Sequence, residues 1–245
     1  MKQKVDVWYL GHCGFAVSVL DTLLIFDYYM DHCEGVRALT SGVIVAEEIT
    51  HKKVLVFSSH QHFDHFNPLI LTWKDKLPQA EFFLSSDIPQ KYHTEGLHLL
   101  NPYEVYETEN LTIRTFKSTD EGIAFLITLY GITLYHAGDL NWWHWDEEPA
   151  DWNEDMAARF KHEIALIKSY PIDIAFLTAD PRQEAAELWG ISYFLEQVET
   201  TTAFPMHFGD DYSIMEHIRD QSVDNPNLKK INLLSVRGQH FELMI

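Results

Sequence analysis

Apolar and polar positions alternate in short runs along the first part of the chain, and this pattern predicts β-strands. Three such runs cover residues 5–10, 15–20 and 23–26, and glycines and an Asp-Thr pair between them favour turns. Residues 54–57 are all apolar, which is typical of a buried strand. Asn67 and Pro68 then provide a cap and a first-turn proline, so we expect a helix from there to about Lys76.

The rest of the chain predicts a second set of strands, now mixed with helices. The expected strands are 111–116, 123–129, 132–135, 172–177 and 201–206. The expected helical segments are 156–167, 183–198 and 214–220. The first of these has apolar residues at 156, 160, 164 and 167, which fall on one helical face. A β-rich half followed by a mixed half predicts an α+β fold in which helices cover two packed sheets.

Length and charge limit the possible organisation and partners. A chain of 245 residues fits one domain, residues 1–245, or two closely packed halves. It carries 18 basic and 37 acidic residues, a formal charge of −19. Such an excess of negative charge disfavours binding to nucleic acid or to an anionic membrane. We therefore expect a small-molecule substrate and neither of those partners.

The sequence shows no obvious export or membrane signal. Its first residues enter a strand-like pattern without an apolar signal segment, and no run approaches the roughly 20 apolar residues of a membrane helix. The two cysteines, Cys13 and Cys33, are too few for a disulfide framework. We expect a cytoplasmic protein.

One short segment concentrates metal-binding side chains. His60, His62, Asp64 and His65 follow the buried strand at 54–57 directly and precede the predicted helix. Imidazole nitrogens and carboxylate oxygens suit zinc and similar metals. Four such groups within six residues cannot all reach one ion from a regular strand or helix, so a loop beside two neighbouring ions is favoured. The alternative is a polar loop that is rich in histidine by chance, although buried crowding of this kind is costly without a metal.

The pattern His60-x-His62-x-Asp64-His65 resembles the signature of the metallo-β-lactamase superfamily, and further landmarks follow in order. Asp27 ends a strand and is similar to the family's first acidic position. Asp139, in Tyr135-His136-Ala137-Gly138-Asp139, resembles its bridging aspartate. His207, in Phe204-Pro205-Met206-His207, resembles its last histidine. The opening Tyr9-Leu10-Gly11-His12-Cys13-Gly14 resembles the L-ascorbate-6-phosphate lactonase-like branch.

The resemblance implies a four-layer αββα sandwich, with the site where strand-end loops from both halves converge. It assigns His60, His62 and Asp139 to one ion, and Asp64, His65, Asp139 and His207 to the other. Asp27 is expected to support the histidine loop from behind through hydrogen bonds. One or two divalent ions per chain are implied, zinc first, with manganese or iron as alternatives.

One part of the sequence departs from the family pattern. A further histidine usually follows the strand that ends near Phe116, but this chain has Lys117-Ser118-Thr119-Asp120-Glu121-Gly122 there. An oxygen of Asp120, Thr119 or Ser118 is the candidate replacement. The first position is therefore expected to bind its ion more weakly than the second, and an oxygen-richer shell would favour manganese or iron.

Other residues near these landmarks have two possible roles. His12 either lines the pocket or orients a ligand, or is a structural histidine near the site. Arg182 either binds a substrate anion or pairs with a carboxylate, and the pair is favoured. The aromatic run Trp142, Trp143, His144 and Trp145 either walls the substrate pocket or packs in the core.

These observations predict a metal-dependent hydrolase that uses metal-bound hydroxide, with Asp64 as a ligand that also accepts a hydrogen bond from the attacking water. The bond cleaved is expected to be an ester, lactone, amide or phosphodiester. Alternatives are a phosphodiesterase or nuclease of the same superfamily, an iron-dependent, dioxygenase-like oxidoreductase, and a binding module without activity.

Overall fold

The computed structural model describes residues 2–245, which form two compact units. The first unit contains the described residues up to Asn101 together with Ser235–Ile245, and the second contains Pro102–Leu234. The first unit is therefore discontinuous in sequence, because its last strand comes from the end of the chain.

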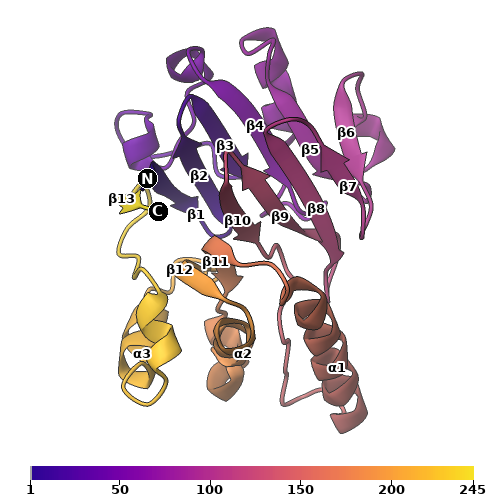
Figure 1. Ribbon diagram of the computed structural model, residues 1–245, viewed down its shortest axis with the longest axis vertical. Helices are drawn as coiled ribbons and strands as arrows, with labels where there is room; N and C mark the ends of the chain where they lie inside the picture. Colours follow the sequence, from indigo (N-terminus) through magenta and orange to yellow (C-terminus); the bar gives the residue numbers. More distant parts are fainter. Residues whose placement is uncertain (1) are drawn as a thin grey trace. The chain divides into compact units, whose positions relative to one another are not determined.

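The first unit is built on a seven-stranded sheet in the order β13-β1-β2-β3-β4-β5-β6 (Figure 1). The strands are β1 (Lys4–Gly11), β2 (Gly14–Val19), β3 (Thr22–Phe26), β4 (Lys53–Ser58), β5 (Glu81–Ser85), β6 (Leu97–Leu100) and β13 (His240–Met244). The pairs from β13 to β3 are antiparallel, whereas β3, β4, β5 and β6 run parallel. The four strands expected in this region are confirmed, while β5, β6 and β13 were not expected from the sequence.

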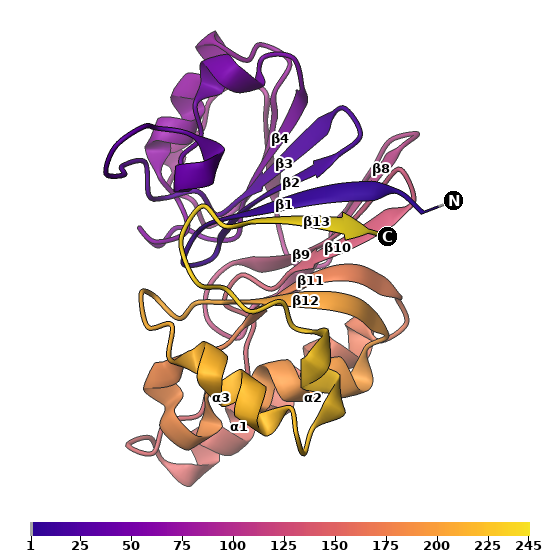
Figure 2. The same cartoon turned by 90° about the vertical axis from the view of Figure 1, so that its left-hand side faces the viewer.

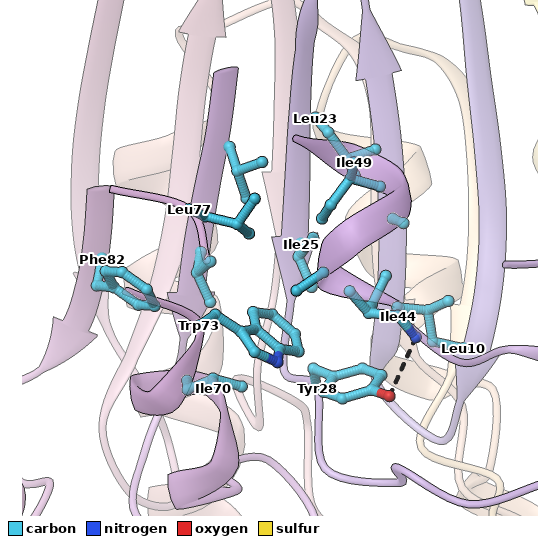
Figure 3. Close-up of a cluster of buried hydrophobic side chains, with 14 of the residues drawn as sticks. Leu10, Leu23, Ile25, Tyr28, Ile44, Ile49, Ile70, Trp73, Leu77 and Phe82 are labelled. Atoms are coloured by element: carbon cyan, nitrogen blue, oxygen red, sulfur yellow. Dashed lines mark hydrogen bonds between the residues drawn. The ribbon is translucent and has the colours of Figure 1, made fainter. Parts of the chain in front are cut away.

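Short 3-10 helices cover one face of this sheet. They are η1 (Leu39–Ser41), η2 (Ala46–Ile49), η3 (Pro68–Asp75) and η4 (Gln90–Tyr92). Trp73, Tyr28 and Ile25 meet in the apolar cluster beneath them, where the Ile44 amide donates to the Tyr28 hydroxyl at 3.1 Å (Figure 3). This cluster fixes the segment that follows β3.

The helix expected at Asn67 begins where predicted, but it is a 3-10 helix and not an α-helix. The Asn67 side chain accepts a hydrogen bond from the Leu69 amide at 2.9 Å and so caps the start. Its two buried residues, Ile70 and Trp73, are three positions apart. That spacing matches the three-residue repeat of a 3-10 helix, which explains the difference.

The second unit contains a six-stranded sheet in the order β12-β11-β10-β9-β8-β7. Its strands are β7 (Val105–Glu107), β8 (Leu111–Lys117), β9 (Ile123–Leu129), β10 (Ile132–His136), β11 (Ile172–Thr178) and β12 (Thr200–Met206). Strands β10, β11 and β12 are parallel, and the others pair antiparallel. All five strands predicted here are confirmed, and the short β7 is an addition.

Helices α1 (Ala150–Ile167), α2 (Trp189–Gln197) and α3 (Ile214–Gln221) lie along one side of this second sheet (Figures 1 and 2). The predicted apolar face of α1 is buried, and Glu163 is buried with it. The Glu163 carboxylate accepts hydrogen bonds from the Tyr103 hydroxyl at 2.6 Å and from the Lys117 amide at 3.2 Å. The helical segment expected at 183–198 is divided between η5 (Pro181–Ala186) and α2, and η6 (Pro226–Lys230) follows α3.

These two sheets with few helices confirm the predicted mixture of α and β structure. Across residues 2–245, no helix combines the length and apolar character needed to cross a bilayer.

Arg237 holds together the loops at one end of the first unit. Its guanidinium donates to the carbonyl oxygens of Leu10 at 2.6 Å, His32 at 2.6 Å, Met30 at 2.5 Å and Gly42 at 2.7 Å. Gly42 has a φ of 71°, which favours glycine. A Cβ at this position would lie 2.5 Å from Arg237 Cγ, so only glycine leaves room for the arginine side chain. One side chain thus ties the C-terminal segment to β1 and to the loop after β3.

We predict that Arg237→Ala lowers the free energy of unfolding by at least about 2 kcal/mol, because four carbonyls lose a charged donor at once. Urea denaturation measures the change. Arg37→Ala is the control, since Arg37 pairs with Asp31 at an exposed position and such pairs contribute about 0–1 kcal/mol. Equal losses in the two variants would contradict this role of Arg237.

Candidate metal centre

The metal-binding side chains follow the carboxyl ends of parallel strands in both units. In the first unit, Asp27 comes directly after β3 and His60 comes two residues after β4. In the second unit, Asp139, Asp180 and His207 come shortly after β10, β11 and β12. Parallel strands bring their carboxyl ends to one edge, which is where ligands bind in such sheets. The topology therefore gathers each set of residues at a single edge of its own sheet.

The first set is the histidine loop, which we define as His60, His62, Asp64 and His65. His60 Nε2 lies 2.9 Å from His62 Nδ1, a separation typical of one hydrogen bond or of two ligands of one ion. The ring centroids of His60 and His65 are 4.0 Å apart. His60 and His65 are fully buried, whereas His62 and Asp64 are partly exposed. The structure thus brings all four predicted loop residues together.

Asp27 contacts this loop from the end of β3, as the resemblance implied. Its carboxylate is completely buried and accepts hydrogen bonds from the amide and the hydroxyl of Ser59, both at 2.7 Å. The same carboxylate lies 2.8 Å from His65 Nδ1. The Ser59 hydroxyl also lies 3.0 Å from His60 Nδ1. Asp27 therefore orients His65 directly and contacts His60 through Ser59.

His12 contacts the other end of the loop. Its Nε2 lies 3.4 Å from a carboxylate oxygen of Asp64. Partial burial by itself raises the pKa of Asp64, but the hydrogen bond from His12 and the charge of His65 outweigh it and hold that pKa well below its usual range. Asp64 is therefore an anion at neutral pH, as a metal ligand must be.

The second set is the strand-end group, which we define as Asp139, Asp180 and His207. His207 Nε2 lies 3.4 Å from an Asp139 oxygen, and its Nδ1 lies 3.0 Å from an Asp180 oxygen. Burial lowers the pKa of His207, but the two carboxylates outweigh that effect and raise it to about 10. This raised pKa means that the two carboxylates favour a positive charge at this position, which a proton or a metal ion supplies.

Asp180 is a site residue that sequence reasoning did not identify. Burial raises its pKa, but hydrogen bonds from His207 and Arg182 bring it down to about 2. The Nε and Nη2 groups of Arg182 donate hydrogen bonds to the same carboxylate, in agreement with the predicted ion pair of Arg182. A signal for Asp180 was present, because it follows a buried strand just as Asp27 and Asp139 do.

The aromatic run after Asp139 makes packing contacts, while its role as a pocket wall stays a prediction. The Trp143 indole donates to the Asp139 carbonyl at 3.0 Å and meets the His207 ring edge-on at 5.3 Å between centroids. Trp142 instead packs against Phe160 and Trp189. His136 is buried in β10, and its Nδ1 accepts from the Gly138 amide at 3.2 Å.

The residues of the 117–122 loop differ in their burial. Ser118 and Thr119 are buried, whereas Asp120 is exposed. The Thr119 hydroxyl donates to the Asn141 carbonyl at 2.7 Å, which links this loop to the segment after Asp139. The role of Asp120 as a replacement ligand stays a prediction.

Three site residues have a left-handed backbone, with φ of 50° at His12, 42° at Asp27 and 69° at His207. Residues other than glycine seldom adopt this region, and each costs about 1–3 kcal/mol, less for Asp and His. This conformation is not confined to the site, because residues outside it also have positive φ, namely Leu20, Tyr103, Tyr130 and Glu184. The buried imidazole and carboxylate donors are the features that fit a divalent metal of the zinc type.

No family model matches this sequence, and no curated protein matches it. Several solved structures, in contrast, have a similar fold. The metallo hydrolase Igni18 from the archaeon Ignicoccus hospitalis is 18% identical with a TM-score of 0.67, covering 98% of this chain and 98% of that one. The metallo-β-lactamase fold protein YhfI from Bacillus subtilis is 14% identical with a TM-score of 0.63, covering 98% and 99%.

The diiron β-hydroxylase CmlA from Streptomyces venezuelae is also similar, at 10% identity and a TM-score of 0.62, covering all of this chain but 55% of that one. At such identities the likeness concerns the fold, so the lactonase-like branch stays a prediction. The chain has the metallo-β-lactamase fold, as the order of its landmarks predicted.

Proposed function

We propose that this protein is a metal-dependent hydrolase acting on a small-molecule ester, lactone or phosphodiester. The observation that carries the proposal is the placement of histidines and carboxylates at the carboxyl ends of parallel strands in both units. The names of Igni18 and YhfI, a metallo hydrolase and a metallo-β-lactamase fold protein, support it.

In this proposal the metal ligands are those that the resemblance implies. His60, His62 and Asp139 would hold one ion, and Asp64, His65, Asp139 and His207 would hold the other. A divalent cation there supplies Lewis acidity and lowers the pKa of water, so that hydrolysis proceeds at neutral pH. Zinc suits the imidazole-rich donors, and manganese or iron are the alternatives.

The chain's own residues then have distinct tasks. Asp64, an anion with a strongly lowered pKa, accepts a hydrogen bond from the attacking water and aims it at the substrate. Asp27 fixes the imidazole of His65, and Asp180 fixes that of His207, so the donors need little reorganisation during the reaction. Trp143 covers the ring of His207 and limits the access of bulk water.

The substrate class follows from charge. The net charge of −19 opposes long-range attraction of a polyanion, so we propose a small molecule acted on in the cytoplasm and no nucleic-acid or membrane partner. Arg182 is engaged by Asp180, so we assign it to that ion pair and not to a substrate anion.

An iron-dependent oxidoreductase is the second candidate, favoured by the similarity to the diiron hydroxylase CmlA. Metal analysis of the purified protein, combined with a screen of ester, lactone and phosphodiester substrates and with oxygen-uptake measurements, separates the two. Zinc or manganese with metal-dependent hydrolysis supports the hydrolase. Iron with oxygen consumption and no hydrolysis would overturn it.

We predict that His60→Ala, Asp64→Ala and His207→Ala each abolish metal-dependent hydrolysis while leaving the fold intact, because all three lie after strand ends that other residues stabilise. Activity and circular dichroism are measured on metal-replete proteins. His51→Ala is the matched control, since His51 is exposed and lies outside both ligand sets. A variant within a few-fold of wild type would remove that residue from the mechanism.

Asp27→Asn should lower metal affinity or activity by about 10–100-fold, because an amide has one acceptor oxygen in place of two and cannot satisfy Ser59 and His65 together. Competition with a chelator measures the affinity. Asp21→Asn, at an exposed turn, provides the control. Unchanged affinity and rate would make Asp27 an ordinary turn residue.

Asp180→Asn should cause a similar loss, about 10–100-fold, because it weakens the contact that orients His207. Arg182→Gln should have a much smaller effect on metal affinity, since Arg182 is largely exposed and reaches His207 through Asp180 alone. Equal losses of metal affinity in Asp180→Asn and Arg182→Gln would mean that Asp180 acts through its ion pair with Arg182 and not through its contact with His207.

A further inference from the structure

Cys13 is a buried sulfur donor at the edge of the histidine loop. It forms, with His12, the two-residue turn between β1 and β2. Its side chain is completely buried, and it is not joined to Cys33 by a disulfide. The backbone after this turn packs closely against the segment after β3, because a Cβ at Gly14 would lie 3.3 Å from the Asp27 carbonyl oxygen.

The distances place this sulfur within a potential coordination shell. Possible ligand atoms of His12, Cys13 and His65 all lie within 4.8 Å of one another. An Asp64 oxygen lies 3.4 Å from His12 Nε2, so a carboxylate joins the same group. Adjacent ligands of a four- or five-coordinate ion with bonds of about 2.0–2.3 Å are themselves about 3–3.5 Å apart. Small side-chain movements would therefore bring Cys13 Sγ within bonding distance of an ion held by Asp64 and His65.

We propose that Cys13 Sγ is a further ligand of the ion that Asp64 and His65 hold. The inference rests on the proposed metal centre and adds a donor that was not expected from the sequence. On binding, the S–H bond breaks, the proton passes to solvent and the thiolate donates its electron pair to the divalent ion, with no change of oxidation state.

A thiolate donor changes the metal preference of the site. Soft sulfur ligands favour zinc and iron, whereas manganese and magnesium favour oxygen. Cys13 therefore counteracts the shift toward manganese that an oxygen donor from the 118–120 loop would cause. The competing explanation is that Cys13 fills space as a small apolar side chain, in which case it has no effect on the metal.

Cobalt substitution distinguishes these explanations, because a Co(II)–thiolate bond gives an intense charge-transfer absorption in the near ultraviolet that nitrogen and oxygen ligands do not. Metal-free wild type, Cys13→Ser and Cys33→Ser are each loaded with Co(II). We expect the charge-transfer band in wild type and Cys33→Ser and its loss in Cys13→Ser, which should retain the weaker visible bands of bound cobalt. Cys33 is the matched control, as the only other cysteine in the chain.

A second measurement needs no variant at Cys13 and covers the case in which Cys13→Ser fails to fold. Zinc X-ray absorption on Cys33→Ser should show a Zn–S distance of about 2.3 Å beside the Zn–N and Zn–O distances of about 2.0–2.2 Å. Bound metal without a sulfur signal in either measurement would overturn the role of Cys13 and leave the hydrolase proposal standing. A protein that binds no metal at all would overturn both.

Discussion

The buried carboxylate of Asp27 is the contact on which the arrangement of the first unit's site depends. A carboxylate without solvent exposure is costly unless its oxygens accept hydrogen bonds, and here Ser59 and His65 supply them. These hydrogen bonds fix the position of Ser59, where the histidine loop begins, and the orientation of the His65 ring. Because Nδ1 of that ring faces Asp27, its Nε2 faces away from Asp27. The ligand geometry is thus a consequence of satisfying one desolvated charge.

The second unit uses the same arrangement on a different strand. Asp180 lies against Nδ1 of His207, as Asp27 lies against Nδ1 of His65. Asp27 comes directly after β3, and Asp180 comes two residues after β11. In both cases the carboxylate sets the ring orientation and makes the imidazole more electron-rich. Two units with unlike helices therefore prepare their histidines by the same physical means.

The sequence was informative where metal-binding side chains follow a predicted strand. The histidine loop could be predicted because it follows the apolar strand at 54–57, and Asp27 and Asp139 were implied by the resemblance. Asp180 also follows an apolar strand but belongs to none of those landmarks, so it was not identified. The positions of Ser59 and Cys13 could not be predicted, because their contacts depend on how the β1–β2 turn and the β4 loop pack together. Strands β6 and β13 are short and lie at the edges of the sheet, where the apolar pattern is weak, whereas the apolar run Phe82-Phe83-Leu84 of β5 was not identified as a strand.

Strand β13 and Arg237 delay the completion of the first unit's fold until late in synthesis. The ribosome delivers residues 235–245 only after all of Pro102–Leu234, yet β13 pairs with β1 and Arg237 binds the carbonyls around Met30 and Gly42. The second unit can therefore fold while translation continues, whereas the first must keep the outer edge of β1 unpaired until residues 235–245 emerge. An exposed strand edge is prone to wrong pairing. The outer edge of β1 is accordingly the part of the first unit most open to wrong pairing before residues 235–245 reach it.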